Sequence, residues 1–425
     1  MPTPNALLSP SDLPLSTLCW TEKKQPRTAL WRSERGALPP KRVVLADDTL
    51  SADSAYRMAC EGTGLLWRGD FQNARLLLQA LARRIDKPPK ASKTAKMGRK
   101  KALTQAETGA TSGEAFHLYR QAQAQRARVL GMVLIEFGAD YGIALRRAPD
   151  AKQACLEAWG PVEDSAGPSV ASLRELMGVI SAHEWRKKGV EIPALTSAGA
   201  AVAKAAPNNR IYPHYGVFSP VRGEYVGLVA TAPLPKKRPA KFVAFDIGTG
   251  TGVLAAVLAL REVDQVVATD QDERALVCAK ENIYKLRLPN PVKVMQADLF
   301  PEGLASVIVC NPPWLPARPG SPLEGAVYDE GSRMLLGFIK GLAAHLAPGG
   351  EGWLILSDFA EHLGLRTRAE LLAAIEAGGL KVLGRMDVKP EHPKALDASN
   401  PLAEARSKEV TSLWRLGAIQ GTATL

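Results

Sequence analysis

Two kinds of hydrophobic pattern divide the chain near residue 200. From Lys241 onward, short apolar runs alternate with amphipathic stretches across short polar connections. This alternation is typical of an α/β fold with a parallel, doubly wound sheet. The strands that we expect are 242–246, 265–269, 292–296, 306–310, 352–357, 380–387 and 409–416. The helices that we expect between them are 253–260, 273–285, 334–346 and 368–377.

Residues 1–200 show helical periodicity instead. The stretch 71–85 places its apolar residues on one face of a helix, and 114–148 and 171–186 are further helix candidates. The stretch 51–68 mixes apolar residues with glycine and stays ambiguous. We therefore expect a largely α-helical N-terminal domain, followed by a second domain over residues 201–425.

Length and composition narrow the class of protein. A chain of 425 residues suggests two or three domains. No apolar run approaches the ~20 residues that cross a bilayer, and the first residues do not resemble a secretory signal. Five scattered cysteines form no C-x-x-C pair, and the six histidines show no metal spacing. We expect a cytoplasmic protein without a membrane segment or a metal site.

The positive charge is unevenly distributed. Residues 1–200 carry 29 Lys+Arg and 20 Asp+Glu, whereas residues 201–425 carry 25 and 23. Nine basic residues and one acid lie in 83–101, within a loop that we expect to be flexible over 83–113. This loop is either a solvated linker or a contact for the phosphates of a nucleic acid.

A glycine-rich turn follows the first strand of the second domain. The sequence FVAFDIGTGTG spaces Gly248, Gly250 and Gly252 at every second position, with Thr249 after the first of them. Glycine permits a tight turn and the close approach of a ligand to the backbone. The spacing differs from the G-x-G-x-x-G of dinucleotide sites. Asp246 immediately before the turn would repel a pyrophosphate, so a cationic or zwitterionic ligand fits better.

Two further acids close the next two strands. Asp270 ends VVATD, where a carboxylate can accept both hydroxyls of a ribose. Asp298 ends VMQAD, where it can accept the exocyclic amine of an adenine. A single aspartate at a strand end caps a turn or a helix about as often as it binds a ligand. Three acids at successive strand ends favour one common ligand.

The fourth strand runs into Asn311, Pro312, Pro313 and Trp314. The two prolines stiffen the turn, so that the Asn311 amide oxygen and a prolyl carbonyl can accept hydrogen bonds from one –NH2 group. The Trp314 ring offers a face on which a planar group can stack. Such an arrangement suits a nitrogen attached to a planar system, because two accepted hydrogen bonds make that nitrogen more nucleophilic.

At these residues the sequence resembles the class I S-adenosylmethionine-dependent methyltransferases over about residues 210–420. The resemblance implies a seven-stranded, Rossmann-like sheet whose last strand is antiparallel. It implies that Asp246 and the loop with Thr249 flank the methionine end of the cofactor. Asp270 would bind the ribose, and Asp298 with the neighbouring Leu299 would lie at the adenine.

Two motifs narrow the resemblance to particular groups within these methyltransferases. The Asn-Pro-Pro-Trp turn is similar to the (N/D)-P-P-(Y/F/W) motif of enzymes that methylate exocyclic amines of adenine or guanine, or the side-chain amide of glutamine. The segment YGVFSPVRGEY, residues 215–225, resembles a segment of the small-domain methyltransferases, which include ribosomal RNA guanine enzymes and release-factor glutamine enzymes. By that resemblance Phe218, Ser219, Pro220 and Arg222 would lie over the methionine end of the cofactor, and Glu224 would brace the loop.

Four functional hypotheses remain open, and the first is preferred. It is a methyltransferase with S-adenosylmethionine as cofactor and an exocyclic amine of an RNA base, preferably in ribosomal RNA, as acceptor. The second is a glutamine methyltransferase acting on a release factor or ribosomal protein, and the third is a DNA adenine methyltransferase. The fourth is a catalytically silent subunit that keeps the cofactor fold and binds RNA.

Overall fold

The computed structural model describes most of the chain in two compact units. The described residues are 16–87, 112–162, 167–197, 208–221, 223–236, 239–320, 322–390 and 401–419. The main division falls between Glu184 and Trp185, which is 16 residues before the boundary expected from the sequence, and residues 112–116 also group with the second unit. Most of the basic loop 83–113 lies outside the described residues.

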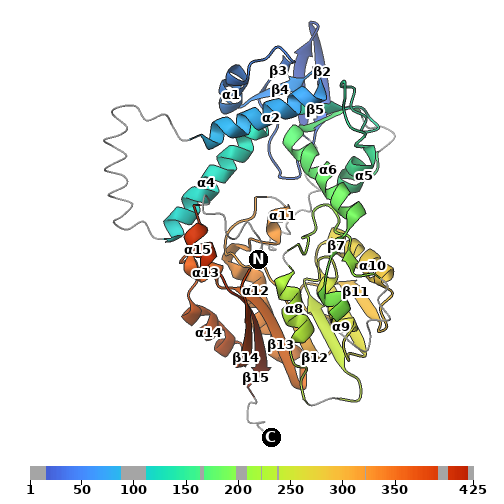
Figure 1. Ribbon diagram of the computed structural model, residues 1–425, viewed down its shortest axis with the longest axis vertical. Helices are drawn as coiled ribbons and strands as arrows, with labels where there is room; N and C mark the ends of the chain where they lie inside the picture. Colours follow the sequence, from blue (N-terminus) through green and yellow to red (C-terminus); the bar gives the residue numbers. More distant parts are fainter. Residues whose placement is uncertain are drawn as a thin grey trace, which may run out of the picture. The chain divides into compact units, whose positions relative to one another are not determined.

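The second unit contains a seven-stranded sheet (Figure 1). Its strands are β9 (Val243–Ile247), β10 (Gln265–Asp270), β11 (Val292–Gln296), β12 (Ala305–Cys310), β13 (Leu346–Ser357), β14 (Leu380–Val388) and β15 (Thr411–Ala418). Their order is β11-β10-β9-β12-β13-β15-β14. The last strand, β15, is antiparallel to both of its neighbours, and the first five strands are parallel. The expected α/β sheet with an antiparallel last strand is confirmed.

Helices cover both faces of this sheet. They include α8 (Glu224–Thr231), α9 (Val253–Ala259), α10 (Glu273–Leu286), α12 (Arg333–His345) and α14 (Arg368–Ala377). The short helices of this unit are α7 (Ala194–Ser197), α11 (Pro322–Gly325), α13 (Phe359–His362) and α15 (Ala403–Ser407). A two-stranded ribbon pairs β7 (Val190–Glu191) with β8 (Arg210–Ile211).

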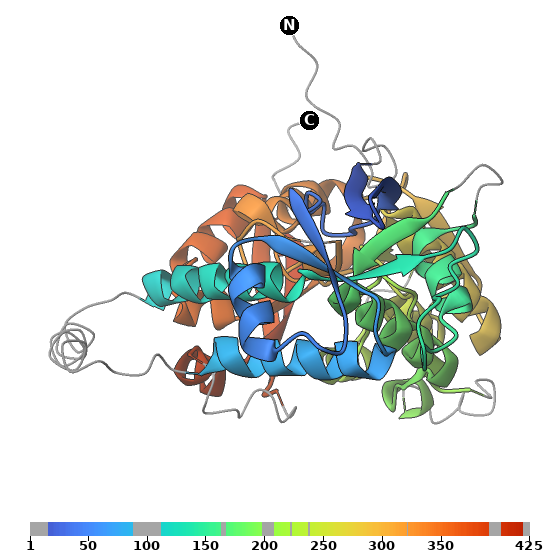
Figure 2. The ribbon, with the colours of Figure 1, turned by 90° about the horizontal axis from the view of Figure 1, so that it is seen from above.

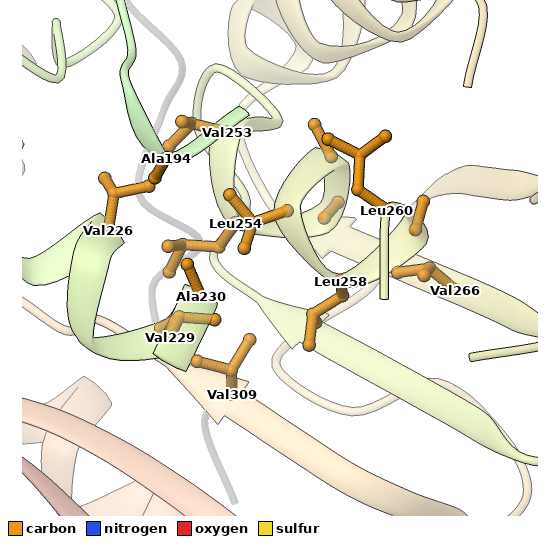
Figure 3. Close-up of a cluster of buried hydrophobic side chains, with 14 of the residues drawn as sticks. Ala194, Val226, Val229, Ala230, Val253, Leu254, Leu258, Leu260, Val266 and Val309 are labelled. Carbon is orange, nitrogen blue, oxygen red and sulfur yellow. The ribbon is translucent and has the colours of Figure 1, made fainter. Parts of the chain in front are cut away.

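Two hydrophobic clusters hold the sheet between these helices. On one face, side chains of α8 and α9 pack against strand residues such as Val266 and Val309 (Figure 3). On the other face, Phe338 and Leu342 of α12 pack against Ile308 of β12. Every residue of α9 and of β12 is buried, which explains the nearly continuous apolar runs of these segments.

The first unit corrects the expectation of a largely α-helical domain. Its core is a six-stranded sheet in the order β1-β2-β6-β5-β4-β3. The strands are β1 (Thr17–Glu22), β2 (Gln25–Trp31), β3 (Arg42–Ala46), β4 (Thr63–Trp67), β5 (Val133–Phe137) and β6 (Ser169–Ser172). The helices are α1 (Ala52–Cys60), α2 (Phe71–Asp86), α4 (Ser112–Leu130), α5 (Lys152–Trp159) and α6 (Leu173–Lys188). Figure 2 shows α1, α2 and the strands β1 to β4 of this unit in blue, and β5 and β6 in teal to green.

The missed strands have a physical explanation. All five residues of β4 are buried, so this strand shows no alternation of apolar and polar positions. The strand β5 follows α4 closely, and its apolar residues extended the helical pattern expected over 114–148. Among the described residues, no helix of either unit is long and apolar enough to cross a membrane.

Candidate functional site

Parallel pairing brings the glycine loop and the Asn-Pro-Pro-Trp turn to one edge of the seven-stranded sheet. The strand β9 lies between β10 and β12, and the three strands run in the same direction. Its last residue, Ile247, pairs with Thr269 of β10 and with Cys310 of β12. The next residues along β9 and β12 are Gly248 and Asn311, so the loop and the turn begin at neighbouring strand ends.

The glycine loop requires glycine for two different reasons. Its three glycines have φ of +71° at Gly248, +54° at Gly250 and +81° at Gly252, a region that side chains with a Cβ rarely adopt. A Cβ on Gly248 would come within 2.4 Å of Met334 Cε, so α12 packs closely against the loop there. A Cβ on Gly250 would meet nothing within 4 Å. The middle of the loop therefore faces open space that a ligand can enter.

Asp246 lies beneath this loop with one oxygen unused. Only 1% of the residue is exposed. Its Oδ2 accepts hydrogen bonds from Thr249 Oγ1 at 2.6 Å and from the Ala255 backbone N–H at 2.9 Å. Its Oδ1 is buried and has no hydrogen-bond partner among the described residues. Burial raises the pKa of Asp246 to about 7, and the two hydrogen bonds oppose that rise.

Asp270 braces the loop from the neighbouring strand. Its Oδ2 accepts from the Gly250 backbone N–H at 2.9 Å, and its Oδ1 accepts from the Asp272 backbone N–H at 3.0 Å. Burial raises the pKa of this carboxyl, while backbone hydrogen bonds from Asp272, Gly250 and Gln271 lower it. A carboxylate has about four lone-pair sites, so Asp270 can still accept a hydroxyl group beside these bonds.

The structure places Asp298 and Leu299 differently from each other. Asp298 accepts a hydrogen bond from Gln271 Nε2, in the turn that follows β10. Leu299 has φ of +68°, and its carbonyl oxygen accepts from Thr269 Oγ1 at 2.6 Å. The Leu299 side chain points toward Gly337 of α12 and packs in the core. Leu299 therefore contributes its backbone, and not its side chain, to this edge.

The Asn-Pro-Pro-Trp turn contains a hydrogen bond that the sequence did not indicate. Trp314 Nε1 donates to Asn311 Oδ1 at 3.0 Å. Pro312 is buried, and Pro313 is half-buried. Trp314 is also half-buried and packs against both hydrophobic clusters of the sheet. The indole is thus held between the core and the Asn311 amide.

The segment before α8 contacts α10. Val217 packs against Ala275 and Cys278, and Phe218 is half-buried. Ser219 Oγ is buried without a hydrogen-bond partner among the described residues. No hydrogen bond or ring contact in the described part of the chain joins Phe218 to the glycine loop, so its place at a cofactor stays a prediction. Arg222 lies outside the described residues.

Two polar residues of this site were missed by the sequence analysis. Asn282 is 1% exposed. Its Oδ1 accepts from the Tyr212 backbone N–H at 2.8 Å, and its Nδ2 donates to the Thr251 carbonyl at 3.0 Å. Asp329 accepts from the Met334 backbone N–H at 2.6 Å and so fixes the start of α12. The available signal for Asn282 was a polar residue on the apolar face of α10.

His214 belongs to a different part of this unit. Its Nε2 lies 3.0 Å from Glu281 Oε2, and Arg186 contacts the same carboxylate at 3.1 Å. Burial lowers the pKa of His214. This histidine is held by a charged cluster on α10 and α6. Within the described residues, no three side chains of His, Cys, Asp or Glu are grouped as metal ligands.

Comparisons with known proteins agree with this geometry. The family described as "Methyltransferase small domain" matches residues 208–368. The chain is 32% identical over 117 residues to a tRNA1(Val) (adenine(37)-N6)-methyltransferase of Pedobacter heparinus, covering 26% of this chain and 50% of that protein. It is 30% identical over 176 residues to a release factor glutamine methyltransferase of Cereibacter sphaeroides, covering 38% of this chain and 58% of that protein. The chain thus spans little more than half the length of these relatives.

A comparison of structures finds a methyltransferase from Pyrococcus furiosus with a TM-score of 0.35. It is 21% identical to this chain, and the match covers 53% of this chain and 98% of that protein.

Proposed function

We propose that this chain, whose residues 208–368 belong to the methyltransferase small domain family, is an S-adenosylmethionine-dependent N-methyltransferase. The observation that carries the proposal is the meeting of two features at one sheet edge. A glycine loop with a buried, half-satisfied carboxylate lies next to a turn that can hold an amine. The first feature fits a cationic cofactor, and the second fits its acceptor.

The residues around the glycine loop fit S-adenosylmethionine. The unpartnered Oδ1 of Asp246 is a buried acceptor that a positively charged group of the cofactor would satisfy. The open space at Gly250 lets the cofactor approach the backbone. Asp270 can accept a ribose hydroxyl, and Asp298, two residues after the end of β11, would accept the amine of the adenine.

The acceptor nitrogen would lie at the Asn-Pro-Pro-Trp turn. When bound, S-adenosylmethionine supplies a methyl group on a sulfonium sulfur, and the methyl carbon leaves that sulfur as it bonds to the acceptor nitrogen. Asn311 Oδ1 keeps one lone pair beside its hydrogen bond from Trp314, and it can accept an N–H of the acceptor. A prolyl carbonyl of the turn accepts the other N–H. Positioning of this kind lowers the barrier without a dedicated base, because the nitrogen releases its proton to water after the transfer.

An exocyclic amine of a base in RNA is the acceptor that we favour. Residues 1–200 carry 29 Lys+Arg against 20 Asp+Glu, and this excess suits a polyanion. The relative from Pedobacter heparinus is named as an adenine N6 methyltransferase of a tRNA. Ribosomal RNA is the first substrate that we would test, and other RNA is the second.

Protein glutamine is the second candidate acceptor. The amide of glutamine is planar and has an –NH2 group that the same turn can hold. The relative from Cereibacter sphaeroides is named as a release factor glutamine methyltransferase. A release factor or a ribosomal protein would then replace the RNA as partner.

A transfer experiment distinguishes these acceptors. The full chain is incubated with methyl-labelled S-adenosylmethionine and with RNA, DNA and protein fractions from cells that lack this gene. We expect label in RNA, and hydrolysis to nucleosides then identifies the methylated base. Label in protein would favour protein glutamine as the acceptor. Label only in DNA would overturn both the RNA and the glutamine proposals. The Asn311→Ala variant is the control for background transfer.

A further inference from the structure

The hydrogen bond inside the Asn-Pro-Pro-Trp turn fixes which atom Asn311 presents. An indole N–H can only donate, so the atom that it meets at 3.0 Å must be the amide oxygen. The oxygen and the –NH2 group of an asparagine side chain are nearly equal in size. A free side chain could turn either of them toward an acceptor amine, and only the oxygen can accept its N–H.

The indole itself is well anchored. Trp314 is half-buried and packs against the clusters on both faces of the sheet. The buried Pro312 restricts the backbone between the two partners. The hydrogen bond therefore joins Trp314, which the core holds in place, to the Asn311 side chain, whose orientation has to be fixed.

We propose that Trp314 is a positioning residue that acts through its indole N–H, by holding the Asn311 amide with its oxygen available to the acceptor amine. This inference rests on the proposed function, since it assigns a role within the same site. Phenylalanine in this position would offer a similar aromatic face without a donor. The hydroxyl of tyrosine would lie at the far end of its ring. In this chain, tryptophan at the last position of the turn supplies that donor.

The Trp314→Phe variant separates positioning from stacking, because it keeps an aromatic ring and removes the N–H. We expect kcat to fall by about tenfold, as for the loss of one orienting hydrogen bond. The KM for S-adenosylmethionine should not change. In the Asn311→Ala background, Trp314→Phe should cause no further loss of kcat. Full activity of Trp314→Phe, or an equal loss in both backgrounds, would overturn the proposal. Trp185→Phe, at an exposed position of α6, is the matched control.

A spectroscopic measurement tests the bond without any substrate. The chain has eight tryptophans, and Trp314→Phe identifies the indole N–H signal of Trp314 in a 15N-labelled sample. We expect this signal to move upfield in Asn311→Ala and to stay in place in Asn311→Asp, which keeps an acceptor oxygen. A Trp314 indole N–H signal that keeps its position in Asn311→Ala would overturn the proposal, whatever the activity of Trp314→Phe. If the bond is present but no substrate is methylated, the proposed function fails and not the geometry.

Discussion

Replacing Asp246 by asparagine should stabilise the ligand-free protein and weaken its binding of the cofactor. The carboxyl is 1% exposed, and its pKa is raised from 3.8 to about 7. Ionising it in the folded chain at high pH therefore costs about 4 kcal/mol, at 1.36 kcal/mol for each pKa unit. Asparagine has no charge to bury, and its oxygen can still accept from Thr249 and Ala255.

The raised pKa of Asp246 determines how the free energy of unfolding changes with pH. Between about pH 4 and pH 7, the folded chain retains a proton on Asp246 that the unfolded chain has released. The free energy of unfolding contributed by this group is thus highest below pH 4, falls as the pH rises, and levels off above pH 7. Asp246→Asn should exceed the wild type in free energy of unfolding by about 4 kcal/mol at pH 8 and by about 2 kcal/mol at pH 5.

Urea unfolding at pH 5 and pH 8 measures this difference. Asp150→Asn, at an exposed position of the first unit, is the matched control and should show no such pH-dependent gain. The same Asp246→Asn protein should bind S-adenosylmethionine at least about tenfold more weakly, because the cofactor's positive charge loses a buried counter-charge. A variant that is less stable than the wild type at pH 8, or a difference that does not change with pH, would refute the reasoning.

Three further predictions concern the acceptor turn, the loop and the basic segment. Asn311→Ala should leave S-adenosylmethionine affinity unchanged in calorimetry and lower turnover by about 10²-fold, the scale for a lost oriented polar group; full activity would contradict its role. Gly250→Ala, at φ of +54°, should lower the free energy of unfolding by about 1 kcal/mol and weaken cofactor binding by about tenfold, because its Cβ occupies the ligand's space. Replacing the basic residues of 83–101 with serine should flatten the salt dependence of RNA binding, and an unchanged slope would make this segment a plain linker.

The seven strands of the main sheet in the second unit and four of its helices could be predicted, because most of these strands are buried apolar runs that end at turn residues. The runs at 243–247 and 305–310 are bounded by glycine and proline, and the structure has strands there. The first unit could not be predicted in this way. The run TGLLW of β4 has no periodicity that separates a buried strand from a buried helix, and only pairing with β3 and β5 decides between them.

The features of the site likewise differ in whether the nearby sequence or the tertiary packing determines them. Asp246, Gly250 and Asn311 could be predicted as site residues because they lie within or just after the ends of strands in a recognisable order. The hydrogen bond between Trp314 and Asn311 depends on side-chain rotamers that the core selects, and no spacing in the sequence indicates it. The link from Asn282 to Thr251 joins residues 31 positions apart and exists only once α10 packs beside the loop.

Binding of S-adenosylhomocysteine to the full chain tests the central claim most directly. Calorimetry at pH 8 should give one site per chain with a Kd in about the micromolar range, where each tenfold step is about 1.4 kcal/mol. Asp270→Ala should weaken that binding by removing the carboxylate that braces the Gly250 backbone and that we propose to bind the ribose. No binding of S-adenosylhomocysteine or of S-adenosylmethionine by the folded wild type would contradict the account.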